Sequence, residues 1–206
     1  MDVTSKPVSI QINQWQKKMF WLMWITYAAF YLGRVNISVA LPGIMEEFGF
    51  TKTNLGIVLS SLFAMYAIGQ FINGQLGDKI NSRRIITFGL ISSAVLNIIF
   101  GFTGGIIGFM VVLWGLNGYV QSMGWGPTVK AMANWFPQNI RGKISGRLGT
   151  CYIIGGAISW LLAGTIIKFF NWRFTFWLPS ILMVVIAIFW FLRARNAPEE
   201  IGLPSL

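Results

Sequence analysis

The sequence predicts an all-α membrane protein with six transmembrane helices. The chain of 206 residues is 55% hydrophobic and only 11% charged, and its mean hydropathy is +0.63. Soluble domains average about 25% charged residues, so this composition excludes an ordinary soluble protein. The apolar runs are as long as a bilayer is thick, and short polar segments separate them.

The six spans follow from the apolar runs and from the segments that interrupt them. At 1.5 Å per helical residue the first run reaches about 34 Å, enough to cross a hydrocarbon core of about 30 Å. Charged or glycine-rich segments then separate the later runs, at residues 77–84, 104–105, 130–143 and 168–173. The predicted spans are Met19–Leu41, Asn54–Leu76, Ile85–Phe102, Ile107–Val129, Ile144–Ile167 and Phe174–Leu192.

The distribution of basic residues predicts the orientation of these spans. One side of the membrane comprises the N-terminus, the tail and two connectors, Gly77–Arg84 and Lys130–Lys143. Its basic residues are Lys6, Lys17, Lys18, Lys79, Arg83, Arg84, Lys130, Arg141, Lys143, Arg193 and Arg195. The other side comprises Pro42–Thr53, the Gly104-Gly105 turn and Lys168–Arg173, with only Lys52, Lys168 and Arg173. The positive-inside rule therefore predicts that both termini are cytoplasmic. Arg147, near the start of the fifth span, is expected to snorkel to that face.

Arg34 is the only charged residue in the first span, and Tyr27 and Tyr31 share its helix face. An Arg at mid-depth costs about 2.5–3.5 kcal/mol of insertion free energy, while each Leu, Ile, Val or Phe returns about 0.3–0.6 kcal/mol. The span therefore tolerates the charge without needing it. This placement predicts an anion-binding site inside the membrane; the alternative is that Arg34 snorkels toward the interface near Pro42.

Polar residues recur at helical spacing along four of the six spans. The stripes are Tyr27, Tyr31, Arg34 and Ser38; Tyr66, Gln70 and Asn73; Asn117, Gln121, Gly124 and Thr128; and Ser145, Gly149, Tyr152, Gly156 and Ser159. They predict that spans one, two, four and five surround a polar cavity, while spans three and six face lipid. The alternative is that small and polar residues only mediate helix packing.

Composition also excludes several classes of activity. The chain has one cysteine and no histidine, so a disulfide framework, a metal site and His-based catalysis lack their residues. We expect no cofactor, no metal and no enzymatic activity, since no nucleophile–base pair is evident. The net charge of +10 lies in clusters between apolar runs, which indicates topology signals and not nucleic-acid binding. The first run is too long for the apolar region of a cleaved signal peptide.

The loop after the second span carries a conformational motif. Residues 74–84 read GQLGDKINSRR, including Gly74, Asp78, Lys79, Arg83 and Arg84, and we assign Arg141, farther along the chain, to the same motif. This order resembles the signature loop of the major facilitator superfamily, with Asn81 in place of a glycine. Asp78 can pair with a basic residue or cap a helix, which would form a latch that differs between conformations. The alternative is that these charges are merely solvated.

Further blocks resemble one family within that superfamily, the organophosphate:phosphate antiporters. They are TYAAFYLGRVN at residues 26–36, QSMGWGP at 121–127, Trp135-Phe136 and Arg141-Gly142, and the resemblance runs from about Lys17 to Pro204. It implies the N-terminal bundle of the major facilitator fold, built from two inverted three-helix repeats. It also implies that Arg34 coordinates a phosphate, with Tyr27, Tyr31, Tyr66, Gln121 and Trp125 at cavity positions.

Two positions depart from the pattern of that family. Gln70 stands where a family member has a lysine, and Tyr152 stands where it has a histidine. Both changes remove positive charge from the neighbourhood of Arg34. They favour a less highly charged ligand, such as a monoanionic phosphate ester or a carboxylate, and leave no proton-sensing histidine.

The predicted organisation is a cytoplasmic segment at residues 1–18, a six-helix bundle at 19–192 and a tail at 193–206 that resembles the start of a linker between two bundles. The resemblance implies half of a secondary transporter in a bacterial inner membrane, which exchanges an organic phosphate and inorganic phosphate by alternating access. A truncated product, a partner or a second copy would account for the other bundle. The alternatives are a receptor for a phosphorylated sugar and an inactive half or assembly subunit.

Overall fold

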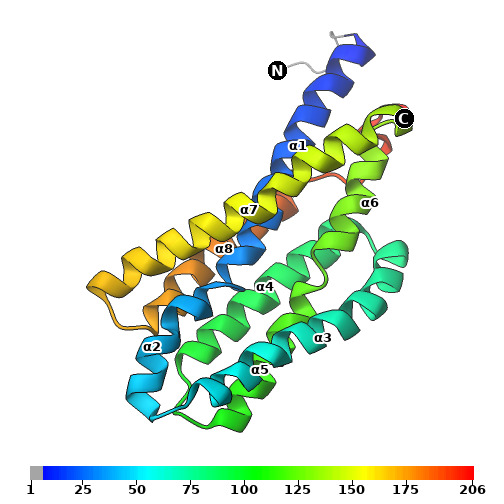
Figure 1. The fold of residues 1–206 in the computed structure, drawn as a ribbon. Coiled ribbons are helices and arrows are strands. Elements are labelled where there is room, and N and C mark those ends of the chain that lie inside the picture. The colour runs from blue at the N-terminus through cyan, green and yellow to red at the C-terminus, as the bar shows by residue number, and fades with distance from the viewer. Residues whose placement is uncertain (1–6) are drawn as a thin grey trace.

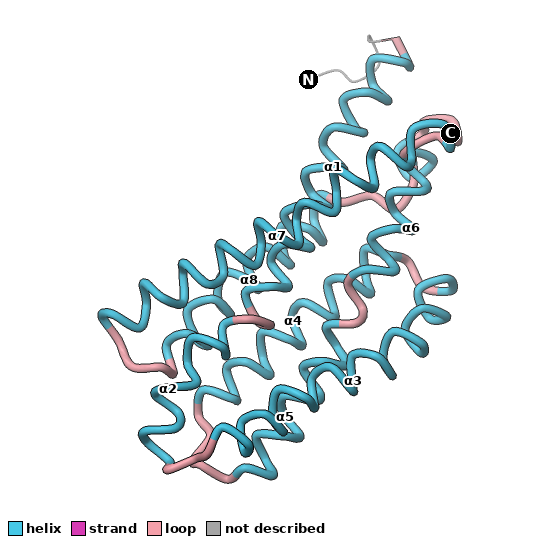
Figure 2. The backbone as a smooth tube through the Cα atoms, viewed as in Figure 1, coloured by secondary structure: helices cyan, strands magenta, loops and turns pink. Residues whose placement is uncertain are grey.

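The computed structural model describes residues 7–206, without the side chain of Asp78, and most of these residues are helical. Eight α-helices and one short 3₁₀-helix are arranged in order, with no strand among these residues (Figures 1 and 2). The elements are α1 (Val8–Leu32), α2 (Asn36–Phe48), α3 (Lys52–Lys79), α4 (Ser82–Gly101), α5 (Ile107–Gln121), α6 (Trp125–Trp135), α7 (Gln138–Phe169), α8 (Phe174–Arg193) and η2 (Pro198–Ile201).

These helices form the six predicted spans, but two of the spans are broken. The first consists of α1 and α2, which part at residues 33–35, and the fourth consists of α5 and α6, which part at residues 122–124. Five helical segments are long and apolar enough to cross a membrane, and the fourth span is not among them because α5 has only 15 residues and α6 only 11. The start of α1 and the C-terminus lie at the same end of the bundle (Figure 1).

Two of the expected connectors are largely helical, because neighbouring helices extend into them. α2 continues through Pro42 to Phe48, so most of the predicted 42–53 connector is helical. α6 ends at Trp135 and α7 begins at Gln138, which reduces the 130–143 connector to two residues. Of the expected segment 1–18, residues 1–6 lie outside the described part of the chain, and α1 already begins at Val8.

Local sequence sets the ends of the helices. Thr51 and Asn54 form a capping box at the start of α3, in which the Thr51 hydroxyl accepts the Asn54 N–H at 3.2 Å. The side chain of Asn81 accepts the N–H of Arg83 at 2.9 Å at the start of α4. Asn81 has φ −61°, so it serves as a helix cap and does not need the left-handed conformation of the glycine it replaces.

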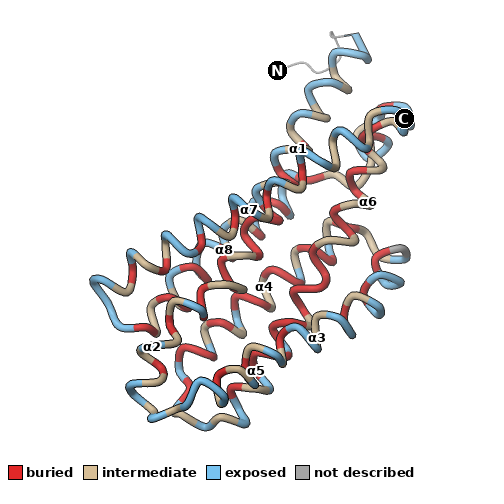
Figure 3. The backbone as a smooth tube through the Cα atoms, in the orientation of Figure 1, coloured by how far each residue is buried: buried red, intermediate tan, exposed pale blue. Residues whose placement is uncertain are grey.

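The interior consists of two apolar clusters with a polar layer between them. The cluster nearer the termini includes Met19, Phe30, Leu90 and Trp190, and the other includes Ile37, Phe100, Met110, Trp114 and Phe176. Between the two clusters lie polar residues that are fully buried: Asn36, Ser93, Asn97, Asn117, Gln121 and Ser180. Figure 3 shows this buried interior where α1, α4, α5, α6 and α8 face one another.

Glycines allow the closest approaches between the helices. A Cβ added at Gly118 of α5 would collide with the backbone carbonyl of Leu62 in α3. A Cβ added at Gly155 of α7 would lie 2.9 Å from the Cα of Ala28 in α1. Backbone at such short range leaves no flexible group to move aside, so these two glycines fix how closely α3–α5 and α1–α7 pack.

We predict that Gly118→Ala destabilises the bundle by about 1–3 kcal/mol, because α5 must move away from α3. Gly146→Ala is the matched control, since a Cβ at Gly146 of α7 meets nothing within 4 Å and alanine favours a helix. Unfolding of the purified chain by SDS in mixed micelles, followed by circular dichroism, measures both variants. Equal stability of the two variants would contradict the proposed backbone contact.

Candidate functional site

The break in the first span places Arg34 in the polar layer of the bundle. α1 ends at Leu32 and α2 begins at Asn36, so backbone carbonyls near the break lose their helical partners. Side chains of α4 and α5 donate to two of these carbonyls, those of Phe30 and Gly33, and the Phe30 carbonyl also accepts the Gly33 N–H at 3.3 Å. Gln121 Nε2 donates to the Phe30 carbonyl at 2.9 Å, and Asn117 Nδ2 and Asn97 Nδ2 donate to the Gly33 carbonyl at 2.8 and 3.1 Å.

A second set of hydrogen bonds joins these side chains to one another. Ser93 Oγ donates to Asn117 Oδ1 at 2.7 Å and accepts from Gln121 Nε2 at 2.8 Å. Asn36 Nδ2 donates to Asn97 Oδ1 and to the Thr175 carbonyl of α8, both at 3.0 Å. The network therefore ties α2, α4, α5 and α8 to the break, and it fixes the orientation of the Gln121 side chain.

The guanidinium of Arg34 is held on one edge and lacks a partner on another. Its Nε donates to Gln121 Oε1 at 3.0 Å. Its Cζ lies 4.8 Å from the ring centroid of Tyr31 and 4.7 Å from that of Tyr66. Its Nη2 is buried and has no hydrogen-bond partner within the described residues. A buried guanidinium donor of this kind is matched to the oxygens of a phosphate or carboxylate.

No carboxylate of the described residues neutralises Arg34. The ion pair found in residues 7–206 joins Arg173 and Glu47 at 2.6 Å, outside this site. An isolated charge in the interior is costly unless an opposite charge pairs with it. The site therefore favours an anionic ligand on electrostatic grounds.

An aromatic wall lies next to Arg34. The rings of Tyr27, Trp125 and Tyr152, from α1, α6 and α7, have centroids 4.7 to 5.3 Å apart. Tyr31 joins this wall at 6.3 Å from Tyr152. Gln70 Nε2 donates to the Tyr66 hydroxyl at 2.8 Å, so Gln70 reaches the site through Tyr66. These side chains present rings and hydroxyl groups near the guanidinium, and none of them adds a charge.

The structure brings together the residues that were predicted from the sequence. Arg34, Tyr31, Tyr66 and Gln121 are in direct contact, Tyr27, Trp125 and Tyr152 form the adjoining wall, and Gln70 lies behind Tyr66. Some other members of the stripes, such as Asn73 and Thr128, are fully buried within the bundle, while Ser38 is exposed. Asn73 Nδ2, for example, donates to Ser122 Oγ at 2.7 Å, and Thr128 donates to the Gly124 carbonyl.

Sequence reasoning missed the contribution of the third span. That span was expected to face lipid, yet Ser93 and Asn97 are fully buried and bond to the network beneath Arg34. Two polar side chains one helical turn apart in an apolar span were the available signal, since such residues face the bundle interior. Asn36 was also missed as the residue that links α2 to this layer.

The conformational motif forms the junction between α3 and α4. Lys130 Nζ of α6 donates to the Gly77 and Ile80 carbonyls at 2.7 and 3.4 Å, where the end of α3 carries partial negative charge. Gly74 is exposed, and a Cβ there would meet nothing within 4 Å. The side chain of Asp78 lies outside the described residues, so the predicted latch remains a prediction.

The other basic residues of the motif differ in their surroundings. Arg141 Nε and Nη2 donate to the Phe136 and Ala133 carbonyls at 2.8 and 2.7 Å, and this caps the end of α6. Arg83 lies over the ring of Phe191 at 5.2 Å, while Lys79 and Arg84 are exposed. The C-terminal tail contacts this end of the bundle, where Glu200 Oε1 accepts a hydrogen bond from Asn81 Nδ2 at 3.1 Å.

Curated proteins that resemble this chain include two that are named for the transport of phosphorylated compounds and one that is named as a membrane sensor. A probable hexose phosphate transport protein of Chlamydia trachomatis is 33% identical over 97% of this chain and 43% of its own length. The glycerol-3-phosphate transporter of Bacillus subtilis is 33% identical over 100% of this chain and 46% of its own length. The membrane sensor protein UhpC of Escherichia coli is 27% identical over 97% of this chain and 45% of its own length.

A solved structure has the same fold. It is the crystal structure of a bacterial homologue of the human lysosomal transporter Spinster in an inward-facing, unoccupied conformation. The TM-score is 0.80 at 15% identity, over 94% of this chain and 44% of that one. This chain thus spans less than half the length of the proteins it matches, and its alignment to them confirms the expected resemblance to the N-terminal half of the glycerol phosphate transporter.

The family assignment rests on a match over most of the chain. The model of the Major Facilitator Superfamily matches residues 23–205, which include most of the first span, the other five spans, the polar layer and the α3–α4 motif. The chain is a multi-pass membrane protein, and it belongs to the Major Facilitator Superfamily.

Proposed function

We propose that this chain is the N-terminal half of a secondary active transporter for an organic phosphate or a related organic anion, with Arg34 as the anion anchor. The observation that carries the proposal is the buried Arg34 Nη2, which has no partner in the described residues, while Gln121 holds the opposite edge of the same guanidinium. The relatives named for hexose phosphate and glycerol 3-phosphate support a phosphorylated substrate.

The arrangement around Arg34 supports binding through a planar fork. The contact from Nε to Gln121 and the two tyrosine rings restrain the guanidinium before any ligand arrives. Such preorganisation lowers the entropic cost of binding. A phosphate oxygen that accepts from Nη2 would make a charge-assisted hydrogen bond in a site screened from bulk water.

Transport by alternating access requires a second bundle to close the site from the other side. In this proposal that bundle comes from a longer product, from a partner or from a second copy of the chain. The end of the bundle that holds the start of α1 and the C-terminus faces the cytoplasm in this proposal, since it carries most of the basic residues. The membrane is the inner membrane of a bacterium, and inorganic phosphate is the counter-substrate.

We predict that Arg34→Gln weakens binding of a phosphate ester by roughly 10- to 150-fold, the effect of losing a hydrogen bond to a charged group. Arg34→Lys keeps the charge but not the planar fork, so it falls between Gln and the natural residue. The measurement is exchange of glycerol 3-phosphate for phosphate in proteoliposomes that contain the chain together with a second bundle.

Lys168→Gln serves as the control, because it removes one exposed positive charge at the far end of α7. Lys168→Gln leaves the exchange of glycerol 3-phosphate for phosphate unchanged if the loss seen in Arg34→Gln arises at the Arg34 site. Normal transport of phosphate esters by Arg34→Gln would show that Arg34 is not the anchor.

We further predict that Gln70→Lys favours more highly charged ligands, because it adds a cation beside Tyr66 at the edge of the site. The affinity for a phosphate dianion relative to a monocarboxylate rises about tenfold. This change corresponds to a modest part of the attractive free energy between two charges in a protein. Gln70→Met removes the same hydrogen bond without adding charge and leaves the ratio unchanged. Competition of each ligand against glycerol 3-phosphate measures the ratio of the two affinities. An equal ratio in Gln70→Lys and Gln70→Met would contradict the role assigned to the added charge.

A ligand-sensing receptor is the second candidate, and the likeness to a membrane sensor protein favours it. Both candidates need an anion site at Arg34, and they differ in whether the bound ligand is released on the opposite side of the membrane. Ligand binding that depends on Arg34, without flux through proteoliposomes that contain both bundles, would favour the receptor. Flux would favour the transporter.

A further inference from the structure

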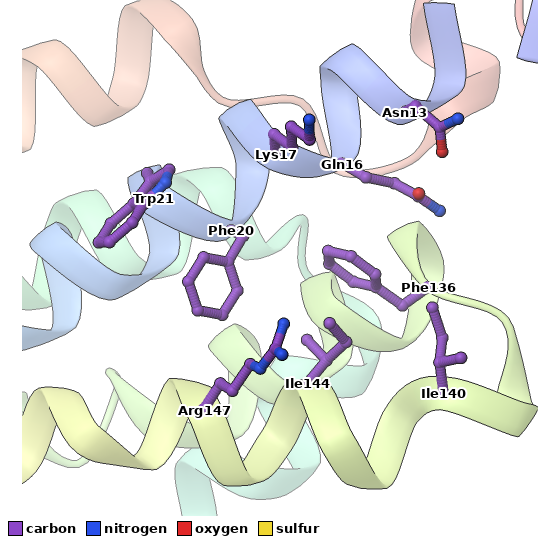
Figure 4. Close-up of a pocket in the computed structure, with 9 residues that line it drawn as sticks. All are labelled: Asn13, Gln16, Lys17, Phe20, Trp21, Phe136, Ile140, Ile144 and Arg147. Atoms are coloured by element: carbon purple, nitrogen blue, oxygen red, sulfur yellow. The ribbon is translucent and has the colours of Figure 1, made fainter. Parts of the chain in front are cut away.

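A second basic pocket lies between α1 and α7, at the end of the bundle that carries the termini. Its volume is about 400 Å³, and its walls include Lys17, Phe20 and Trp21 of α1 together with Ile144 and Arg147 of α7. Figure 4 shows Arg147 extending from α7 toward α1, beside Phe20 and Ile144, with Lys17 on the α1 side. Lys17 lies about 25 Å from Arg34 along the axis of the first span, so the two sites are separate.

The pocket has a net positive charge with no internal compensation. None of its lining residues is acidic, and the side chains of Lys17 and Arg147 make no hydrogen bond or ion pair with residues 7–206. The amide group of Asn13 adds polar atoms to the same rim, and so does that of Gln16, whose Nε2 already donates to the Trp135 carbonyl at 2.9 Å. Cations and amides around one hollow match the oxygens of a phosphate group.

Apolar side chains continue from the pocket toward the middle of the membrane. On α1, Trp21 and Ile25 are 58% and 43% exposed. On α7, Ile154 and Ile158 share the helix face of Arg147 and are 43% and 48% exposed. The order from the end of the bundle inward is therefore cation, tryptophan, aliphatic, which is the polarity profile of one leaflet of a bilayer.

We infer that this pocket binds the phosphodiester headgroup of an anionic phospholipid, whose acyl chains lie along the exposed faces of α1 and α7. Lys17 and Arg147 contact the phosphate oxygens, and Trp21 lies at the level of the glycerol backbone. The cytoplasmic leaflet supplies such lipids, and basic pockets between transmembrane helices on that side are suited to them. The inference depends on the orientation proposed above but not on a phosphate at Arg34.

The test is native mass spectrometry of the 206-residue chain released from detergent with equal amounts of phosphatidylglycerol and phosphatidylcholine. The natural chain retains phosphatidylglycerol preferentially. Lys17→Gln/Arg147→Gln reduces that preference by roughly 25-fold, from about fivefold for each cation near an anionic lipid. The matched control, Lys143→Gln/Arg193→Gln, removes two charges at the same end but outside the pocket, and it retains the preference.

Further arms distinguish other occupants. Inorganic phosphate or glycerol 3-phosphate in excess leaves the lipid bound if the acyl chains contribute, whereas displacement by either would assign the pocket to a soluble phosphate and overturn the inference. A lipid-free complex of two chains that Lys17→Gln/Arg147→Gln disrupts would assign it to a second copy. Equal retention of both lipids by the natural chain would also overturn it.

Failure here is separable from failure of the proposed function. Arg34→Gln is expected to retain phosphatidylglycerol, because Arg34 does not line this pocket. Loss of lipid preference in Arg34→Gln would mean that the headgroup binds at the polar layer, and the assignment to Lys17 and Arg147 would be wrong.

Discussion

The hydrogen bonds from Asn97, Asn117 and Gln121 to the carbonyls of the broken first span are the interaction on which the rest of the structure depends. Inside a bilayer no water satisfies a backbone carbonyl, and each one left without a partner costs several kcal/mol. The amide side chains of α4 and α5 remove that cost. They allow the chain to leave the helical conformation at residue 33. The guanidinium of Arg34 then lies at a point where a continuous helix would present only its lateral surface.

The same network also constrains Arg34 itself. Gln121 uses its amide nitrogen for the Phe30 carbonyl and Ser93, which leaves its oxygen directed at Arg34 Nε. The second break, at residues 122–124, comes directly after Gln121, so both broken spans meet beside Arg34. Gly124 permits this meeting, because a Cβ there would lie 3.0 Å from the ring of Tyr27. Half-helices that end around a charged ligand site are a recurrent arrangement in transporters built from inverted repeats.

Much of this was predictable from the sequence, and the rest was not for identifiable reasons. Span number and the grouping of Arg34 with Tyr31, Tyr66 and Gln121 follow from helical periodicity and from the cost of a charge in lipid. The breaks were missed because TYAAFYLGRVN reads as one apolar helix until the partners of its carbonyls are known. Those partners come from 64 to 91 residues away, and local patterns do not report such contacts. The network role of Asn97 was hidden for the same reason.

The most direct test is solid-state NMR of the chain in lipid, with ¹⁵N-labelled arginine and a bound phosphate ester, to detect coupling between phosphorus and the side-chain nitrogens. In the natural chain the account predicts strong coupling to a single Nη signal, while Nε of Arg34 keeps its hydrogen bond to Gln121. This coupling disappears in Arg34→Lys. Coupling that persists in Arg34→Lys, or that appears only at Arg147, would contradict the claim that Arg34 anchors the anion.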